Sequence, residues 1–157
     1  MADPPERDHP HVRFPPPLVF AGFVLLGFAT HRLTGWARDD LGTWHYAALP
    51  LGLAGLWLNG ASLLGFRRLG ENPEPWTPTR AMVEEGPYRF TRNPMYLGML
   101  LVSLAIAAWF GSIWVAVGAI LAAAIIDRTV IVAEERYLRR TLGERYADYR
   151  RRVRRWL

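Results

Sequence analysis

Four apolar stretches alternate with polar segments along the chain. A helix that crosses a lipid bilayer needs about 20 predominantly apolar residues, because each residue advances the helix by about 1.5 Å. Each stretch has or approaches this length, so the pattern predicts an all-α integral membrane bundle of about four transmembrane helices. The predicted spans are residues 18–36, 43–66, 94–110 and 112–133.

The connections between these stretches add detail. Only Gly111 separates the third stretch from the fourth, so the two should form an antiparallel helical hairpin. Asn59 is the only strongly polar side chain in the second stretch, and we expect it to hydrogen-bond a neighbouring helix rather than bind a ligand. The first stretch could instead be a secretory signal, but its leader is rich in proline rather than basic, which favours a retained span.

The polar segments divide the chain into three regions. Residues 1–17 contain six prolines among charged residues and are predicted to be a disordered N-terminal segment. Residues 18–78 hold the first two spans and the start of a long polar loop, in which three prolines (Pro73, Pro75 and Pro78) exclude a regular helix. Residues 79–157 contain the hairpin and the segment that follows it.

The chain becomes amphipathic beyond Glu135. Apolar residues recur at steps of three and four from Leu138 to Trp156, arginines occupy mostly the other face, and Gly143 is a candidate break. This pattern is typical of a C-terminal helix that lies in the lipid headgroup layer. So many arginines could also suit a nucleic acid, but the apolar stripe favours anionic lipid, and we expect no nucleic-acid partner.

Composition and charge restrict the possibilities further. All 19 basic residues are arginine, and ten of them lie between Arg128 and Leu157. The loop 67–92 holds five arginines and the turn at Gly111 none, so the positive-inside rule places both termini and this loop in the cytoplasm, in a multi-pass protein of the inner membrane. The chain has no cysteine, and its four histidines are not spaced with acids as metal ligands would be, so we expect no metal.

Ionisable residues appear at the end of the fourth span. Asp127 and Arg128 are followed by the pair Glu134 and Glu135, and such residues near membrane depth usually face a cavity or one another. Arg128 and Glu135 are seven positions apart, so a regular helix would place them on one face. Asp127 and Arg128 could equally form a charge pair at the membrane surface. The glutamates share the cytoplasmic side with the polar stretch 86–98, whose arginines and aromatic rings suit a zwitterionic ligand.

Three motifs in the second half of the chain carry a family resemblance. GPYRFTRNPMYLG at 86–98, EERYL at 134–138 and LGERYADYRRRV at 142–153 together resemble the bacterial branch of the isoprenylcysteine carboxyl methyltransferase family, which is related to the membrane phospholipid methyltransferases. The resemblance covers residues 79–157. Asn93 and Arg80 stand where that family commonly has histidine, and Leu142 stands where it usually has phenylalanine.

The resemblance implies transfer of a methyl group from S-adenosylmethionine to a lipophilic acceptor, namely a carboxylate, amine or hydroxyl of a lipid-like or small apolar molecule. Arg128 corresponds, after a shift in the alignment, to an arginine of the family and is the candidate catalytic residue. The residues that the resemblance assigns to the cofactor are Arg80, Met82, Val83, Tyr88, Arg92, Asn93, Pro94, Tyr96, Glu134 and Glu135.

Two other classes of protein remain open at this point. Membrane sterol reductases carry a similar motif and bind a nicotinamide cofactor, although they are longer and have more spans. A non-catalytic membrane protein could also keep the site as a structural cap, in which case the departures at Asn93 and Arg80 would be signs of decay. A response to NADPH would separate the reductase from the methyltransferase.

Overall fold

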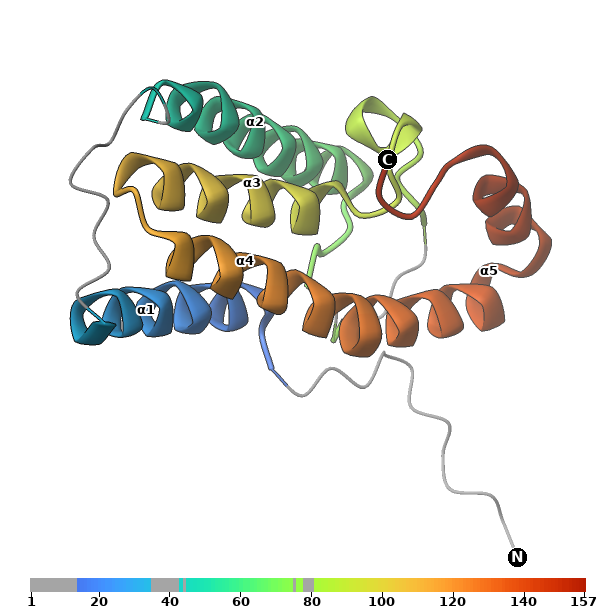
Figure 1. Cartoon of the computed structure of the whole chain (residues 1–157). Helices are drawn as coiled ribbons and strands as arrows, with labels where there is room; N and C mark the ends of the chain where they lie inside the picture. Colours follow the sequence, from blue (N-terminus) through green and yellow to red (C-terminus); the bar gives the residue numbers. More distant parts are fainter. Residues whose placement is uncertain (1–13, 35–42, 44, 75, 78–80) are drawn as a thin grey trace, which may run out of the picture.

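The computed structural model describes residues 14–34, 43, 45–74, 76–77 and 81–157. Within these ranges the chain is helical and has no strand (Figure 1), which confirms the all-α prediction. The elements in chain order are α1 (Pro16–Thr34), α2 (His45–Leu69), the short 3₁₀ helix η1 (Gly86–Arg89), α3 (Pro94–Trp109), α4 (Ile113–Ile126), the π-helical turn η2 (Asp127–Ile131) and α5 (Val132–Arg152).

The apolar helices match the predicted membrane bundle. Three helices of the described chain are long and apolar enough to cross a membrane: α1, α2 and the continuous helix Ile113–Arg152, while α3 is a shorter apolar helix of 16 residues. α1 begins at Pro16, inside the segment predicted to be disordered, because proline is tolerated in the first turn of a helix. Residues 1–13 of that segment lie outside the described residues.

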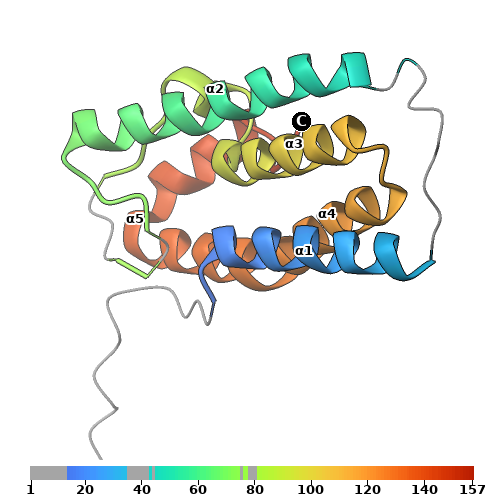
Figure 2. The ribbon, with the colours of Figure 1, turned by 90° about the vertical axis from the view of Figure 1, so that its left-hand side faces the viewer.

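Two helix pairs form the bundle: α2 packs along α3, and α1 packs along α4 (Figure 2). The first pair approaches most closely at two glycines. A Cβ atom on Gly55 would lie 2.7 Å from the carbonyl oxygen of Gly98, so only glycine permits this crossing. Small residues of this kind let membrane helices pack backbone against backbone.

Asn59 lies at the same crossing. Its side-chain amide donates a hydrogen bond to the carbonyl oxygen of Gly55, one turn earlier on α2, at 2.9 Å. The predicted hydrogen bond to another helix is therefore wrong. The residue of α3 that faces this amide is Gly98, which has no side chain to accept a hydrogen bond.

The end of α5 departs from a straight path. Gly143 has φ 52° and ψ −127°, a conformation that glycine adopts without steric cost, and the helix bends there and folds back (Figure 1). Its apolar stripe does not face lipid: Tyr146 and Tyr149 are buried against Met82, with Leu138 packed beside them. The predicted contact of this stripe with lipid is wrong, because the polar loop supplies apolar partners within the protein.

The connections between the helices determine which polar segments of the chain lie together. The turn between α3 and α4 lies at one end of the bundle, together with the end of α1 and the start of α2 (Figure 1). The end of α2, the start of α3 and all of α5 lie at the opposite end. α3 and α4 therefore run in opposite directions and pack together, which confirms the predicted antiparallel hairpin. The same arrangement places the loop that precedes α3 beside α5.

Candidate functional site

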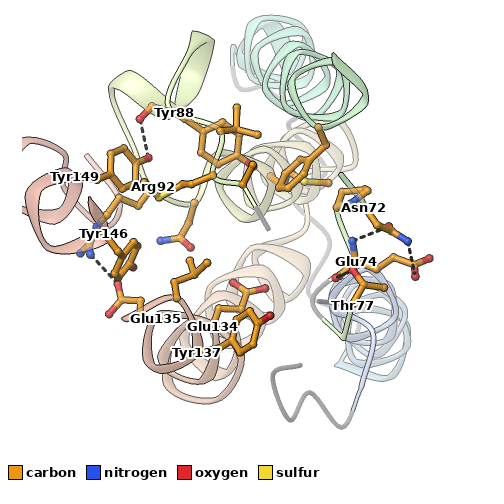
Figure 3. Close-up of a pocket in the computed structure, with 18 of the residues that line it drawn as sticks. Asn72, Glu74, Thr77, Tyr88, Arg92, Glu134, Glu135, Tyr137, Tyr146 and Tyr149 are labelled. Atoms are coloured by element: carbon orange, nitrogen blue, oxygen red, sulfur yellow. Dashed lines mark hydrogen bonds and ion pairs between the residues drawn. The ribbon is translucent and has the colours of Figure 1, made fainter. Parts of the chain in front are cut away.

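A cavity of about 120 Å³ lies at this polar end of the bundle (Figure 3). Its walls come from the end of α2, the loop before α3, the first turn of α3 and α5. It brings together eight of the residues predicted from the sequence: Met82, Val83, Tyr88, Arg92, Asn93, Tyr96, Glu134 and Glu135. It is also lined by Asn72, Glu74, Thr77, Tyr137, Tyr146 and Tyr149, which the sequence did not single out as site residues.

The other predicted residues do not line this cavity. Pro94 is buried at the first position of α3, where its ring fixes the start of the helix, and Arg80 lies outside the described residues. The side chain of Arg128 is 85% exposed, and its Nε atom lies 3.8 Å from Oδ2 of Asp127. The structure thus does not bring Arg128 to the cavity.

The π-helical turn η2 explains the position of Arg128. A π-helical turn adds a residue to the helical path, and one added residue rotates later side chains by about 100° relative to a regular α-helix. Because η2 covers Asp127–Ile131, positions seven apart across it no longer share a face. Glu135 is buried whereas Arg128 is exposed, so the predicted shared face is wrong.

Glu134 lies on α5, beyond the apolar helix α4, and faces the start of α3. The hydroxyl group of Tyr96 donates a hydrogen bond to its Oε1 atom at 2.6 Å. Burial raises the pKa of Glu134 to about 7; the hydrogen bond from Tyr96 opposes this effect, and the charge of Glu135 adds to it. Glu134 can therefore gain or lose a proton near neutral pH, and a cationic ligand would favour its ionised form.

Glu135 has a different environment. Its two oxygens accept hydrogen bonds from Nε and Nη2 of Arg155 at 3.1 and 2.7 Å, which is a bidentate ion pair. Nη1 of Arg92 lies 3.1 Å from the same Oε1 atom that Nε of Arg155 contacts. Two guanidinium groups thus balance a carboxylate that is only 3% exposed.

Arg92 lines the cavity and carries a hydrogen-bond donor without a partner in the described part of the chain. Its side chain is 10% exposed, and its Nε atom is buried without a hydrogen-bond partner among the described residues. A buried donor left without a partner costs free energy, about 1–3 kcal/mol. An anionic group bound in the cavity could satisfy it.

Aromatic rings close one side of the cavity. The hydroxyl group of Tyr149 donates to the carbonyl oxygen of Tyr88 at 2.8 Å, which ties α5 to the short helix η1 (Figure 3). Burial raises the pKa of Tyr88, and the charge of Glu134 adds to this effect. The phenol therefore stays neutral at physiological pH, and Tyr88 lines the cavity as an uncharged aromatic residue.

Arg155 does not line the cavity, but it is a further functional candidate that the sequence did not reveal. It lies in the segment 153–157 that follows α5, and its ion pair with Glu135 raises the pKa of its guanidinium. No local pattern distinguishes it from the nine other arginines between Arg128 and Leu157. Only the tertiary contact with Glu135 does so.

The comparisons with known proteins agree with this geometry. The sequence model of the phospholipid methyltransferase family matches residues 43–145. The chain belongs to the phospholipid methyltransferase family. An uncharacterized protein of Haemophilus influenzae is 40% identical to it over 63 residues, which are 40% of this chain and the whole of that relative. No solved structure matches the chain.

Membership of the phospholipid methyltransferase family confirms the predicted kind of protein, a member of a membrane methyltransferase family related to the isoprenylcysteine carboxyl methyltransferases. The family match includes the residues of the loop and of α3 that line the cavity, and also Glu134 and Glu135. Tyr146, Tyr149 and Arg155 lie beyond its end at position 145. The cavity therefore combines residues inside the match with residues outside it.

Proposed function

We propose that this chain is a membrane methyltransferase that transfers a methyl group from S-adenosylmethionine to a lipophilic acceptor. The observation that carries the proposal is the cavity at the polar end of the bundle, where Arg92, Glu134 and Glu135 face a wall of tyrosines. The family match supports the reaction class.

The residues of the cavity fit the charged groups of this cofactor. Its amino-acid end carries a carboxylate, which the guanidinium of Arg92 could bind through the unpartnered Nε atom. Its amine and its sulfonium are cationic, and the half-buried carboxyl group of Glu134 and the ring of Tyr88 suit such charges. The cavity of about 120 Å³ is smaller than the roughly 300–1,000 Å³ of typical small-molecule sites, so the nucleoside end would extend beyond it.

S-adenosylmethionine supplies a methyl group that is already activated on a positively charged sulfur. The protein then needs to orient the acceptor and to exclude water, and holding two reactants in line can contribute up to roughly 7–11 kcal/mol. A carboxylate acceptor is ionised at neutral pH and needs no base. For an amine or hydroxyl acceptor, Glu134 could take the proton, because its pKa of about 7 suits a general base.

A second cavity suggests how a lipophilic acceptor reaches the site. This cavity, of about 480 Å³, lies beside α2 and is lined by Trp57, Leu64 and Arg68. Trp57 and Leu64 are 60% and 52% exposed, so this face would contact the bilayer. Met82 and Val83 line both cavities, and we propose that the acceptor enters sideways from the membrane and meets the cofactor across them.

The arginine distribution supports an orientation for the protein. The end of α2 carries Arg67 and Arg68, and α5 carries seven arginines, whereas the turn between α3 and α4 has none. By the positive-inside rule, we propose that the site faces the cytoplasm of a bacterial cell and that the chain crosses the inner membrane several times.

Binding of S-adenosylhomocysteine, the demethylated product, tests the cofactor assignment. Isothermal titration of detergent-purified protein should show saturable binding that weakens by at least about tenfold in Glu134→Gln and Glu135→Gln, since each removes a carboxylate that lines the cavity. Glu144→Gln, on the exposed side of the same helix, is the matched control and should bind normally. Binding of NADPH instead would support a reductase and contradict the proposal.

Methyl transfer tests the acceptor. Membranes from cells with and without the protein are incubated with S-adenosylmethionine labelled in its methyl group and separated into lipid, protein and small-molecule fractions. The proposal expects protein-dependent label in the lipid fraction or in an apolar small molecule. Label confined to soluble, polar products would contradict a lipophilic acceptor.

A further inference from the structure

The segment after α5 crosses the polar end of the bundle as a strap, which we define as residues 153–156. Its main chain runs beside the residues that precede α3: the backbone N–H of Arg92 donates to the carbonyl oxygen of Arg154 at 2.9 Å. The next carbonyl, that of Arg155, accepts two side-chain hydrogen bonds, from Thr91 Oγ1 at 3.1 Å and from Asn93 Nδ2 at 2.9 Å. The main chain of Arg155 is thus held by two side chains of the motif at 86–98.

The side chain of Arg155 contacts acidic residues of η2 and α5. Its guanidinium binds Glu135 through two hydrogen bonds and approaches both oxygens of Asp127 at 3.4 and 3.5 Å. The indole N–H of Trp156 donates to Asp127 Oδ1 at 3.0 Å. Asp127 therefore anchors the strap to the end of the fourth apolar helix.

The π-helical turn makes this arrangement possible. Asp127 and Glu135 are eight positions apart, which on a regular α-helix would separate their directions by about 80°. The added residue of η2 shifts the register by one, so that the pair behaves approximately like positions seven apart. Both carboxylates then meet one guanidinium, and this explains why Asp127, and not Arg128, belongs to the network.

We propose that Arg155 is a positioning residue of the site, which fixes the carboxylate of Glu135 beside Arg92 at the cavity, and that Asn93 acts as the amide donor that holds Arg155 in place. The inference rests on the proposed function, because it assigns Glu135 and Arg92 to cofactor binding. A bidentate pair sets the direction of a carboxylate as well as its charge. Arg155 reaches the cofactor only through Glu135.

The proposal also accounts for asparagine at a position where histidine is common in the resembling family. Asn93 cannot titrate, and its contact with the strap requires only an N–H donor. A histidine has an N–H in both its neutral and its protonated form, so it could hold the same carbonyl. Aspartate has no donor when ionised and could not.

Binding of S-adenosylhomocysteine to detergent-purified variants tests the role of Arg155. Arg155→Ala should weaken binding by about tenfold, the usual order for losing a charge-assisted contact. Arg155→Lys should also weaken it, since lysine cannot form the bidentate pair, and it decides the question if the alanine variant does not fold. Arg151→Ala is the charge-matched control, because its side chain is exposed and pairs with Asp148 on the same helix.

A double-mutant cycle separates positioning from a general structural role. If Arg155 acts through Glu135, Arg155→Ala should weaken binding by less than about twofold in a Glu135→Gln background, since the two changes then remove one interaction. An equal loss in both backgrounds would overturn the proposal. So would wild-type affinity in Arg155→Ala.

Hydrogen exchange of the cofactor-free protein tests Asn93. The amide of Arg92 should exchange slowly in the wild type and in Asn93→His, and faster in Asn93→Asp, which cannot hold the strap. Asn93→His should keep binding within about threefold of the wild type, and Asn93→Asp should lose about tenfold, because only the first retains the donor. Equal exchange in all three proteins would overturn the assignment of Asn93.

The two readouts distinguish this inference from the proposed function. A wild-type protein that does not bind S-adenosylhomocysteine would refute the proposed function and the positioning role of Arg155, while the exchange measurement would still decide how the strap is held. A wild-type protein that binds, together with an Arg155→Ala variant that binds equally well, would refute only the inference.

Discussion

The apolar bundle and the polar end of this protein are stabilised in different ways. In the bundle, polar side chains such as Asn59, Ser62 and Ser103 hydrogen-bond carbonyl groups of their own helix, and the helices approach one another at glycines. At the polar end, hydrogen bonds and ion pairs join segments that lie 20 to 68 positions apart in the sequence. Glu84, for example, pairs with both Arg145 and Arg152.

This difference reflects what each region has to do. A membrane bundle gains little from the hydrophobic effect between its helices, because lipid is as apolar as leucine, so close packing matters most. The polar end must hold charged groups in defined directions around a cavity, and directional contacts achieve this. A change in the bundle should therefore affect stability, whereas a change at the polar end should affect ligand binding.

The largest effect on stability is expected for Gly55→Leu. The new side chain would begin 2.7 Å from a backbone oxygen of α3, so the two helices would have to separate, at a cost of about 3 kcal/mol. Gly60→Leu is the matched control on the same helix, because a Cβ atom there meets nothing within 4 Å. Thermal unfolding in detergent compares the two, and equal midpoints would contradict glycine packing as the basis of the bundle.

Tyr96→Phe should affect binding more than stability. The change removes the hydroxyl group that donates to Glu134 at 2.6 Å, and the loss of a hydrogen bond to a charged group should weaken binding of S-adenosylhomocysteine by about tenfold. Tyr46→Phe, at a position that is 71% exposed, should leave the affinity unchanged. A drop in unfolding temperature without any change in affinity would show that Tyr96 stabilises the fold and does not contribute to binding.

Stability should also depend on pH through Glu134. The pKa of this carboxyl group rises from 4.5 to about 7 on folding, so between these values the folded protein binds more protons than the unfolded chain. Stability should therefore decrease as the pH rises from about 5 to 8, because the buried group must then ionise. Unfolding temperatures across this range should fall in the wild type and stay flatter in Glu134→Gln; parallel curves would contradict a protonated Glu134.

The smallest effect is expected for Arg128→Ala. The side chain is 85% exposed and interacts loosely with Asp127, so binding of S-adenosylhomocysteine should change by less than about twofold, as for most surface substitutions. Arg92→Ala, which removes a buried guanidinium at the cavity, is the contrasting variant and should lose most of the affinity. A large loss in Arg128→Ala would restore the catalytic assignment that the family resemblance suggested.

Much of the fold could be predicted from the sequence. Length and polarity located the apolar helices, since a bilayer imposes a nearly fixed span, and the close spacing around Gly111 predicted the hairpin. The glutamate pair and the motif around Asn93 were expected to meet, and they line one cavity. The direction of the Asn59 hydrogen bond and the burial of the apolar stripe of α5 were not foreseen, because both depend on which surface lies opposite.

The sequence by itself therefore determined the helices and the residue types gathered at the polar end, because hydrophobic periodicity and motif spacing are local properties. Tertiary structure decided which charges meet. One added residue in η2 turns Arg128 outward and brings Asp127 into register with Glu135, and the fold at Gly143 returns Arg155 to the start of α3. Such contacts depend on helix phase and on the path of the chain. Neither can be predicted from the residue type at a single position.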